Sequence, residues 1–422
     1  MTGKHSLDSE NQGKSKKHKN DGEDLDEFND LDDTITFDHI DSKITDSDLY
    51  LDTINRKILN FDLPIECCST LATSNIHICL VCNKYLQGGS INSPAYIHSV
   101  DNDHHIFFNT EKSNFTILPE QVILSDKRSE ELNDIKLLFS PVFDGLNFDK
   151  DQYYGQTLNG RKYRVGFIPL VNDTESGTES IAVLHNMLYY ALSHVSLLRD
   201  LMIRHSYTDS QPLANEISKL TKKVWSRYLF HDMVSSLSIE NYISTLSYKI
   251  TSDLKLFYSW IVNILSKEVK IVKEIFIGKV QVSDQIVKFS NLTVDLPQPS
   301  VFKDGTSSSI EQYQLTDLIK RKNYTIIKSP KVLVIYIDRS NGIKFEGIKQ
   351  NLNTNVVNFD PNLLQLGDFK YRLVANITYD NKIHVLDKVN QQYKEFDGIS
   401  VKNFEKELLF ISNSRLQFWE IY

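Results

Sequence analysis

The stretch RKYRVGFIPLVNDTESGTESIAVLHNMLYYALSHVSLLRDLMIR, residues 161–204, decides the fold of this chain. It begins as a strand-like lead-in, passes through a polar loop and continues as a long apolar helix. Apolar side chains recur in the helix at steps of three and four residues, at Leu184, Met187, Leu188, Ala191, Leu192, Val195, Leu198 and Met202. This spacing predicts a helix with one face buried in a core.

Length and composition indicate a globular protein of about two to three domains. Of the 422 residues, 41% are hydrophobic and 24% are charged. The sequence contains no apolar run of membrane-spanning length and no apolar segment of a secretory signal near its start, so we expect an intracellular protein. A net charge of -8 favours protein partners over general coating of nucleic acid, although a local basic patch remains compatible with it.

The N-terminal residues 1–50 are predicted to form a disordered, charged arm, because almost no large apolar residue precedes Phe28. Within this arm KSKKHK, residues 14–19, is a candidate nuclear localisation signal and suggests a protein of the nucleus; such clusters are also common in disordered tails. Residues 44–62 are expected to form a helix that leads into the next domain.

The rest of the chain is predicted to divide at residues 125 and 150, giving a cysteine-rich domain over 51–125, a connector over 126–150 and a large domain over 151–422. After the opening helix of the large domain, the periodicity predicts helices over 213–229, 239–248 and 254–269. From residue 270 onward short β-branched runs predict strands, beginning with IVKEIFIGKVQV and ending with ELLFISNSRLQFWEIY. Helices followed by strands indicate an α+β domain with an antiparallel sheet.

A zinc-binding pattern lies in the cysteine-rich domain. CLVC is followed by two histidine positions in the spacing Cys-x2-Cys-x15-His-x5-His, with Cys79, Cys82, His98 and His104 as the candidate ligands of one structural zinc ion. Alternatives stay open at this point: Cys67 or Cys68 could replace a histidine, and His105 could replace His104. In the simplest alternative, the cysteines are buried small residues and the histidines lie on the surface.

The stretch CLVCNKYLQGGSINSPAYIHSVDNDHHIFFN, residues 79–109, resembles the zinc-finger UBP domain that many ubiquitin-specific proteases carry before their catalytic domain. It is most similar to the version in the spliceosomal, catalytically inactive branch of that family. Fingers that capture the ubiquitin C-terminus use an Arg just after the cysteine and aromatic residues around a pocket. Here Asn83 and Lys84 stand at that place, so the resemblance implies a structural or protein-docking finger.

Residues 151–422 resemble the catalytic domain of the ubiquitin-specific proteases, a papain-like cysteine protease fold with helical and antiparallel-sheet halves. Asn186 matches the Asn that follows the nucleophile by three residues in this family, which puts Val183 at the nucleophile position. No cysteine follows Cys82 in the sequence. Any fingers hairpin around residues 274–293 must therefore be held by packing, because the two CxxC pairs of the family's second zinc site are missing.

The resemblance also implies that the catalytic imidazole is lost. The family's Gly-His-Tyr segment is reduced to residues 380–382, and His384 is expected to lie in the strand that follows. Asp397 matches the acidic residue that orients the catalytic imidazole in this family, but an orienting carboxylate alone has no catalytic role. We therefore expect no catalytic residue and no enzyme activity.

The resemblance implies a non-catalytic pre-mRNA splicing factor, a pseudo-deubiquitinase scaffold in the assembly or stability of the U4/U6.U5 tri-snRNP. Its expected partners are tri-snRNP proteins, with U5 components first, while snRNA contact is expected to be indirect or minor and neither ubiquitin nor a membrane is expected. A non-hydrolytic ubiquitin-binding adaptor is the alternative, and it would need intact ubiquitin contacts. A hydrolase using a serine or a displaced histidine, and an unrelated zinc-containing α+β protein, are the remaining alternatives.

Overall fold

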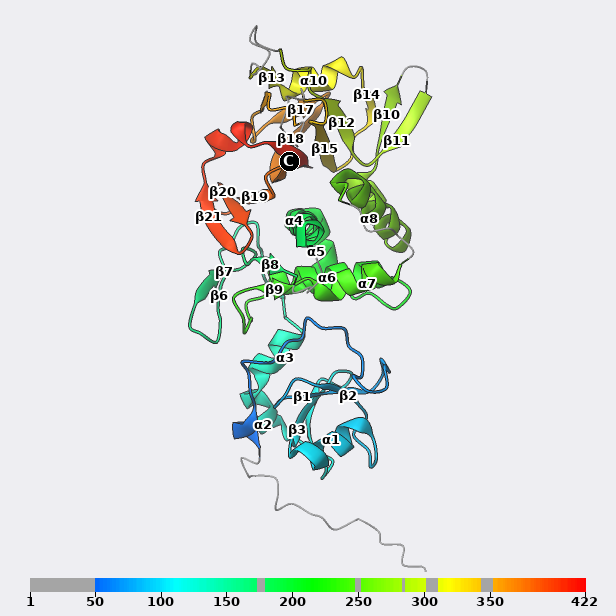
Figure 1. Ribbon diagram of the computed structural model, residues 1–422, viewed down its shortest axis with the longest axis vertical. Helices are drawn as coiled ribbons and strands as arrows, with labels where there is room; N and C mark the ends of the chain where they lie inside the picture. The colour runs from blue at the N-terminus through cyan, green and yellow to red at the C-terminus, as the bar shows by residue number, and fades with distance from the viewer. Residues whose placement is uncertain (1–49, 173–178, 247–251, 283–284, 301–309, 343–351) are drawn as a thin grey trace, which may run out of the picture. The chain divides into compact units, whose positions relative to one another are not determined.

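The computed structural model describes residues 50–172, 179–246, 252–282, 285–300, 310–342 and 352–422 (Figure 1). The predicted N-terminal arm and its basic cluster lie outside the described residues, apart from Tyr50.

The cysteine-rich domain contains a five-stranded antiparallel sheet in the order β2-β1-β3-β4-β5. Its elements are β1 (Ile76–Cys79), β2 (Tyr85–Gln87), α1 (Pro94–Asn102), β3 (Ile106–Asn109), β4 (Asn114–Ile117) and β5 (Val122–Ile123). The strand-like HHIFFNT and FTILP segments of the sequence are confirmed as the hairpin β3–β4. The connector that follows is partly helical, with α2 (Asp126–Glu131) and α3 (Asn133–Phe139).

The predicted helix over 44–62 is wrong for the residues that the structure describes. Only the short 3-10 helix η1 (Leu51–Thr53) forms there, and no helix covers residues 54–63. The sequence explains the difference, because Leu59, Phe61, Leu63 and Ile65 alternate with polar residues or proline, which is the period of an extended chain.

This non-helical segment contacts the helical half of the large domain. Asp62 accepts hydrogen bonds from the Lys223 ammonium group and from the backbone N–H of Ser235, the second at 3.1 Å. Nearby, Nε2 of His231 lies 3.1 Å from the carbonyl oxygen of Leu59. The chain before the finger thus ties the two domains together.

The helical half of the large domain contains four short strands and six helices among its described residues. They are β6 (Tyr154–Gln156), β7 (Lys162–Arg164), β8 (Leu170–Val171), α4 (Glu179–His194), α5 (Ser196–Arg204), α6 (Pro212–Val224), β9 (Val234–Ser235), α7 (Leu237–Thr245), α8 (Leu254–Glu268) and α9 (Val272–Phe276). The run IVKEIFIGKVQV, which we predicted as a strand, therefore begins with the helix α9. The helices predicted over 213–229, 239–248 and 254–269 are confirmed as α6, α7 and α8, with ends that differ by a few residues.

The single long helix predicted from the opening stretch is two helices. Val195 adopts an extended conformation (φ -70°, ψ 109°) and separates α4 from α5, which meet at an angle of 85°. The apolar periodicity continues across this bend, and that is why the sequence pattern alone did not reveal it. In the described part of the chain no single helix is long and apolar enough to cross a membrane; α4 and α5 reach that hydropathy only when taken together.

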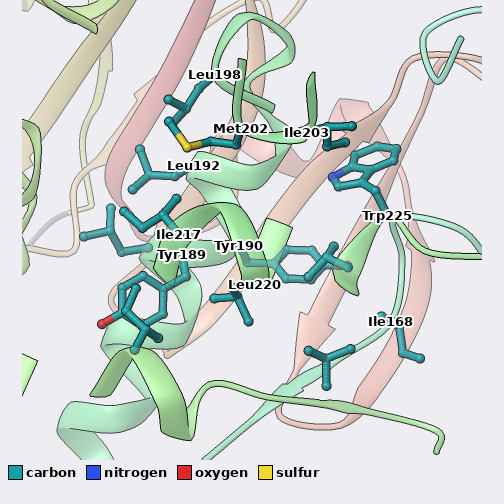
Figure 2. Close-up of a cluster of buried hydrophobic side chains, with 14 of the residues drawn as sticks. Ile168, Tyr189, Tyr190, Leu192, Leu198, Met202, Ile203, Ile217, Leu220 and Trp225 are labelled. Atoms are coloured by element: carbon teal, nitrogen blue, oxygen red, sulfur yellow. The ribbon is translucent and has the colours of Figure 1, made fainter. Parts of the chain in front are cut away.

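The main hydrophobic core surrounds α4, α5 and α6 (Figure 2). Tyr190, Leu192 and Met202 are almost completely buried there, beside Trp225 from the end of α6. The Trp225 indole N–H donates to the carbonyl oxygen of Ser193 at 2.9 Å, so the polar atom of this large side chain is satisfied inside the core.

The sheet half is built on an eight-stranded sheet with the path β12-β15-β22-β18-β19-β20-β21, in which β17 pairs with β18. All of its pairs are antiparallel except β12–β15. The strands are β12 (Leu292–Asp295), β15 (Val332–Asp338), β17 (Leu364–Leu366), β18 (Phe369–Thr378), β19 (Lys382–Asp387), β20 (Gln392–Asp397), β21 (Ser400–Phe404) and β22 (Ser414–Ile421). The predicted strand over ELLFIS is wrong, because this segment forms the 3-10 helix η2 (Lys406–Ile411).

Both faces of this sheet are covered. Along β15, Val332 and Val334 belong to the core shared with the helices, whereas Leu333 and Ile335 belong to a second core on the opposite face. The second core includes residues of α10 (Leu315–Arg321), beside the pair β13 (Gln312–Gln314) and β16 (Val356–Asn358). A separate three-stranded sheet, β11-β10-β14, is made of β10 (Gly278–Val282), β11 (Gln285–Phe289) and β14 (Thr325–Lys328). Its β10–β11 pair lies within residues 274–293, the range in which any fingers hairpin was expected.

We expect Arg199→Met to lower the free energy of unfolding by about 2 kcal/mol. Arg199 is 3% exposed, bonds Asp149 at 3.0 Å and Asp200 at 2.7 Å, and lies 4.7 Å from the centre of the Trp225 ring. Breaking a fully buried pair costs roughly 3–5 kcal/mol, but the two carboxylates are 36% and 39% exposed, so water can solvate them in the variant. Urea unfolding measures the change.

The control for this prediction lies one turn along the same helix. Arg204 is 71% exposed and only 3.9 Å from Asp200, so Arg204→Met should change stability by less than about 0.5 kcal/mol. Burial raises the pKa of Asp149, but the charges of Arg199 and Lys388 and the hydrogen bonds from Arg199 and Ser196 together outweigh it and leave the pKa below its usual range. A lowered pKa stabilises the fold above the unfolded-state value of about 4, so the difference between wild type and Arg199→Met should shrink as the pH falls below that. Equal losses in both variants would contradict the prediction.

Candidate functional site

The four candidate metal ligands come from three local structures. Cys79 ends β1, and the turn after it places Cys82 beside it. Asn83 closes this turn in the left-handed region (φ 61°), with its N–H donating to the Cys79 carbonyl oxygen at 2.9 Å. Asn is one of the few residues other than Gly that tolerates this conformation, so the residue found in place of the family's Arg has a structural role here.

The two histidines are positioned by α1 and the residues after it. Pro94 starts α1, and the Ser93 hydroxyl caps it by accepting from the N–H of Tyr96 at 3.5 Å. His98 lies in the second turn of this helix, and His104 follows its end. A Ser-Pro start therefore fixes the direction from which an imidazole reaches the cysteine turn.

The distances between the four side chains fit a tetrahedral zinc ion. Their ligand atoms all lie within 4.8 Å of one another. Cys79 Sγ is 3.6 Å from His104 Nδ1, Cys82 Sγ is 3.3 Å from His98 Nε2, and the two imidazole nitrogens are 3.2 Å apart. With Zn–S of about 2.3 Å and Zn–N of about 2.0–2.1 Å, tetrahedral edges would be about 3.6 Å for S···N and about 3.3 Å for N···N. The donor set and its spacing therefore fit one zinc ion.

The surroundings of these side chains also favour a cation. Cys79 is fully buried and His98 nearly so. Burial raises the pKa of the Cys79 thiol, which keeps it protonated and a poor donor. A bound dication reverses this effect, because it stabilises both thiolates by direct coordination.

The alternative ligands lie elsewhere. Cys67 Sγ accepts from the backbone N–H of Gln87 at 3.2 Å, and Cys68 is exposed. His105 has both ring nitrogens engaged, one 2.8 Å from the carbonyl oxygen of Leu118 and the other 2.8 Å from Asp103. Among the described residues, the structure brings Cys79, Cys82, His98 and His104 together and leaves these three residues outside the group.

A small apolar cleft lies at the start of α4, where the family's active site would be. It has a volume of about 60 Å³ and is lined by Leu170, Val183, Asn186, Met187, Tyr190, Asn381, Ile383, Phe396 and Gly398. No Cys, His, Asp or Glu belongs to this lining in the part of the chain that the structure describes. Val183 is 36% exposed at the cleft, and Tyr190 packs on Phe396 with ring centres 4.3 Å apart.

His384 points away from this cleft. It is a residue of β19, as expected, and its neighbour Ile383 lines the cleft, so the alternation of a strand puts His384 on the other face of the sheet. There its Nε2 is 3.0 Å from a Glu395 carboxylate oxygen and its ring lies 4.2 Å from that of Phe404. Burial lowers the pKa of His384 despite this carboxylate.

The other two polar candidates near the cleft are also engaged. Asp397, at the end of β20, lies 3.4 Å from the Lys382 ammonium group. His185, two residues after Val183, is 1% exposed, stacks on Phe257 and lies 3.1 Å from the Glu240 carboxylate. These contacts place both side chains in structural pairs.

Comparison with known proteins agrees with this architecture. The sequence family described as the zinc finger in ubiquitin hydrolases and other proteins, zf-UBP, matches residues 66–127. The pre-mRNA-splicing factor SAD1 of Saccharomyces cerevisiae is 30% identical over 426 residues, which cover 88% of this chain and 93% of SAD1. The chain belongs to the SAD1 family. The α+β fold predicted from the sequence, a zinc-finger UBP domain followed by a ubiquitin-specific-protease-like domain, is thereby confirmed.

Two further comparisons extend the SAD1 relationship. The crystal structure of an essential yeast splicing factor has a TM-score of 0.75 at 28% identity and covers 88% of this chain and 99% of that one. Ubiquitin carboxyl-terminal hydrolase 39 of Homo sapiens is 26% identical over 462 residues, covering 88% of this chain and 79% of the human protein. The SAD1-family likeness therefore spans both domains.

Two features of this SAD1-family chain were missed by sequence reasoning. The turn role of Asn83 had a local signal, since an Asn just after CxxC suits a positive φ. The contact between Tyr190 and Phe396, which closes the cleft, joins residues far apart in the chain and had no signal in a single sequence.

Proposed function

We propose that this protein is a non-catalytic pre-mRNA splicing factor, a pseudo-deubiquitinase scaffold that supports the assembly or stability of the U4/U6.U5 tri-snRNP. The observation that carries the proposal is the match to SAD1, a pre-mRNA-splicing factor, over 88% of this chain and 93% of SAD1. The match covers the finger and the protease-like domain together, so it concerns the whole architecture and not one shared module.

The proposal that the domain does not hydrolyse ubiquitin conjugates is supported by the sequence and by the cleft. A thiol protease needs a thiolate and an imidazole in contact with it. The chain has no cysteine after Cys82, Val183 stands at the nucleophile position, and His384 lies on the other face of the sheet. The proposal is therefore that the protease-like fold acts as a scaffold without this catalytic chemistry.

We further propose Cys79, Cys82, His98 and His104 as the ligands of a structural zinc ion. The cluster geometry supports this assignment. Two thiolates and two imidazoles fill all four positions of a tetrahedral ion, which leaves no open position for a catalytic water. The zinc then stabilises the finger, and the domain boundaries proposed are 51–125 for the finger, 126–150 for the connector and 151–422 for the protease-like domain.

The partners proposed are tri-snRNP proteins, with U5 components first, and the proposed location is the nucleus. Spliceosomal relatives and the basic cluster at residues 14–19 support a nuclear site. The net charge of -8 supports contact with protein subunits over extensive contact with snRNA.

Affinity purification of the tagged chain from nuclear extract tests the proposal. We expect the recovered material to contain U4, U5 and U6 RNAs and tri-snRNP proteins, because a scaffold of the particle co-purifies with it. U1 and U2 RNAs, measured in the same eluate, are the internal control, and the tag alone is the background. Recovery of U4, U5 and U6 at the level of that background would rule the proposal out.

A further inference from the structure

The strand β11 forms an open edge of the three-stranded sheet β11-β10-β14 (Figure 1). Among the described residues it pairs with β10 alone, over all five of its positions. In an antiparallel pair, every second residue turns its backbone N–H and C=O groups away from the neighbouring strand. The outer side of β11 therefore presents a row of backbone donors and acceptors, which is the pattern that a further strand matches.

Apolar side chains are exposed on both faces of β11. Ile286 is 63% exposed on one face and Val287 is 46% exposed on the other, because successive residues of a strand point to opposite sides. Proteins usually protect an open edge with polar or charged side chains. The edge strand β21 of the large sheet follows this rule, since its exposed residues are Ser400, Lys402 and Asn403. The edge β11 instead leaves two β-branched apolar side chains in contact with water.

A single positive charge lies on the same edge. Lys288 follows Ile286 by two residues, so the two side chains share a face, and Lys288 is exposed and forms no ion pair in the described part of the chain. Its direct neighbour across the β10–β11 pair is Lys279, and like charges directly opposite each other are unfavourable in a sheet. A carboxylate on the outer side of Lys288 would offset this repulsion. The edge therefore fits a strand with an acidic residue two positions from an apolar one.

We propose that β11 is a docking edge for an extended segment of a partner protein, which adds to the sheet as a fourth strand. The backbone groups of the edge select a polypeptide, because a polypeptide strand supplies matching donors and acceptors along its length. The segment carries a carboxylate opposite Lys288 and apolar side chains opposite Ile286 and Val287. This inference rests on the edge itself and does not depend on a role in splicing.

A second copy of this chain fits the edge less well than such a segment. If two β11 strands pair antiparallel over all five residues, Lys288 of each faces Ile286 of the other, so neither ammonium group gains a carboxylate. If they pair parallel and in register, the two Lys288 side chains face each other, which is repulsive. The side chains of β11 are thus complementary to a different sequence and not to their own.

The test measures binding of the purified full chain to two fluorescein-labelled peptides of about ten residues by anisotropy. Their central segments are Thr-Glu-Val-Ile-Thr and its reverse, which place Glu opposite Lys288 in antiparallel and parallel addition respectively. We expect saturable binding of at least one peptide. Two versions of that peptide, N-methylated at alternate residues in the two possible phases, report on the backbone. One version should lose binding at least about tenfold and the other should keep it, because a strand turns only every second N–H toward its neighbour.

Variants of the chain test the side-chain part of the proposal. The wild type should prefer the Glu peptide over its Lys counterpart by about threefold or more, and Lys288→Glu should reverse this preference. The matched control is Lys328→Glu, an exposed lysine of β14 at the opposite edge of the same sheet, which should keep the wild-type preference. Ile286→Thr should weaken binding of the Glu peptide by about threefold. All three substitutions are at exposed positions, so each variant should melt like the wild type.

Three outcomes would overturn the proposal. They are no saturable binding of either peptide below about 1 mM, equal losses with both N-methylated versions, and a concentration-dependent dimer of the wild type that Ile286→Thr abolishes. The last outcome would assign the edge to a second copy of the chain. Purified chain and synthetic peptides are used, so this test can fail while tri-snRNP association holds, and the reverse.

Discussion

Cys82→Ser is expected to abolish zinc binding and to unfold the finger around α1 and the cysteine turn. A structural zinc contributes on the order of 10 kcal/mol to the folding of such modules. The hydrophobic cluster beside the site has only five buried members, Cys79, Leu86, Ala95, Phe107 and Leu118. Only Leu86, Phe107 and Leu118 among them are large, and at about 1.5–3 kcal/mol each they contribute about 5–9 kcal/mol together, which is less than the metal supplies.

Metal analysis and hydrogen exchange together measure this effect. We expect one zinc per wild-type chain and none in the variant, with loss of amide protection over residues 79–104. Protection should persist longer in β4, because Phe115 belongs to the larger core that continues into the connector. The metal chelator that removes zinc from the wild type should reproduce the same pattern of exchange.

Cys68→Ser is the matched control for the zinc prediction. Cys68 carries the same thiol, is exposed and lies outside the cluster of four ligand atoms. The control should retain its zinc and its protection. A Cys82→Ser protein that has lost its zinc yet keeps the protection of α1 would show that the finger does not depend on the metal.

Local patterns in the sequence predicted local structure well. The ligand spacing from Cys79 to His104 depends on one turn and one short helix, both of which have their own signals in CxxC and Ser-Pro. The same holds for β18, β19 and β22, whose β-branched and aromatic residues match strand preferences. Short-range spacing was enough in these cases.

Predictions failed where tertiary contacts decide the conformation. The bend at Val195 lets α5 turn away from α4 while both stay buried, and periodicity cannot distinguish a bent helix from a straight one. The contact between Asp62 and Lys223, which holds the chain before the finger, joins residues more than a hundred and fifty positions apart and had no signal in the sequence. Lys279, Lys288 and Lys328 are likewise brought opposite one another only by strand register, which the sequence does not reveal.

Val183→Cys is expected to leave the protein without measurable hydrolase activity. An isolated thiol is only a few per cent ionised at pH 7. Losing one member of a catalytic triad typically costs about a millionfold in rate. The introduced thiol would face a cleft whose described lining offers no imidazole, while His384 stays bonded to Glu395 on the other face of the sheet. Val183 is partly exposed, so the substitution itself should change stability by less than about 0.5 kcal/mol. A fluorogenic ubiquitin substrate and ubiquitin with an electrophile at its C-terminus measure turnover and trapping.

A second variant tests whether Val183→Cys is inactive because the cleft lacks a base or because the cleft is inaccessible. Asn381 lines the same cleft in a turn with φ 57°, a conformation that His also tolerates. In the double variant Val183→Cys, Asn381→His the alkylation rate of the introduced thiol should rise relative to the single variant, because an imidazole in the lining of the same cleft favours the thiolate. A faster rate in the double variant alone attributes the inertness of the single variant to the missing base. Turnover by Val183→Cys alone would instead show that the chain still supplies a base, and the assignment of a non-catalytic scaffold would be wrong.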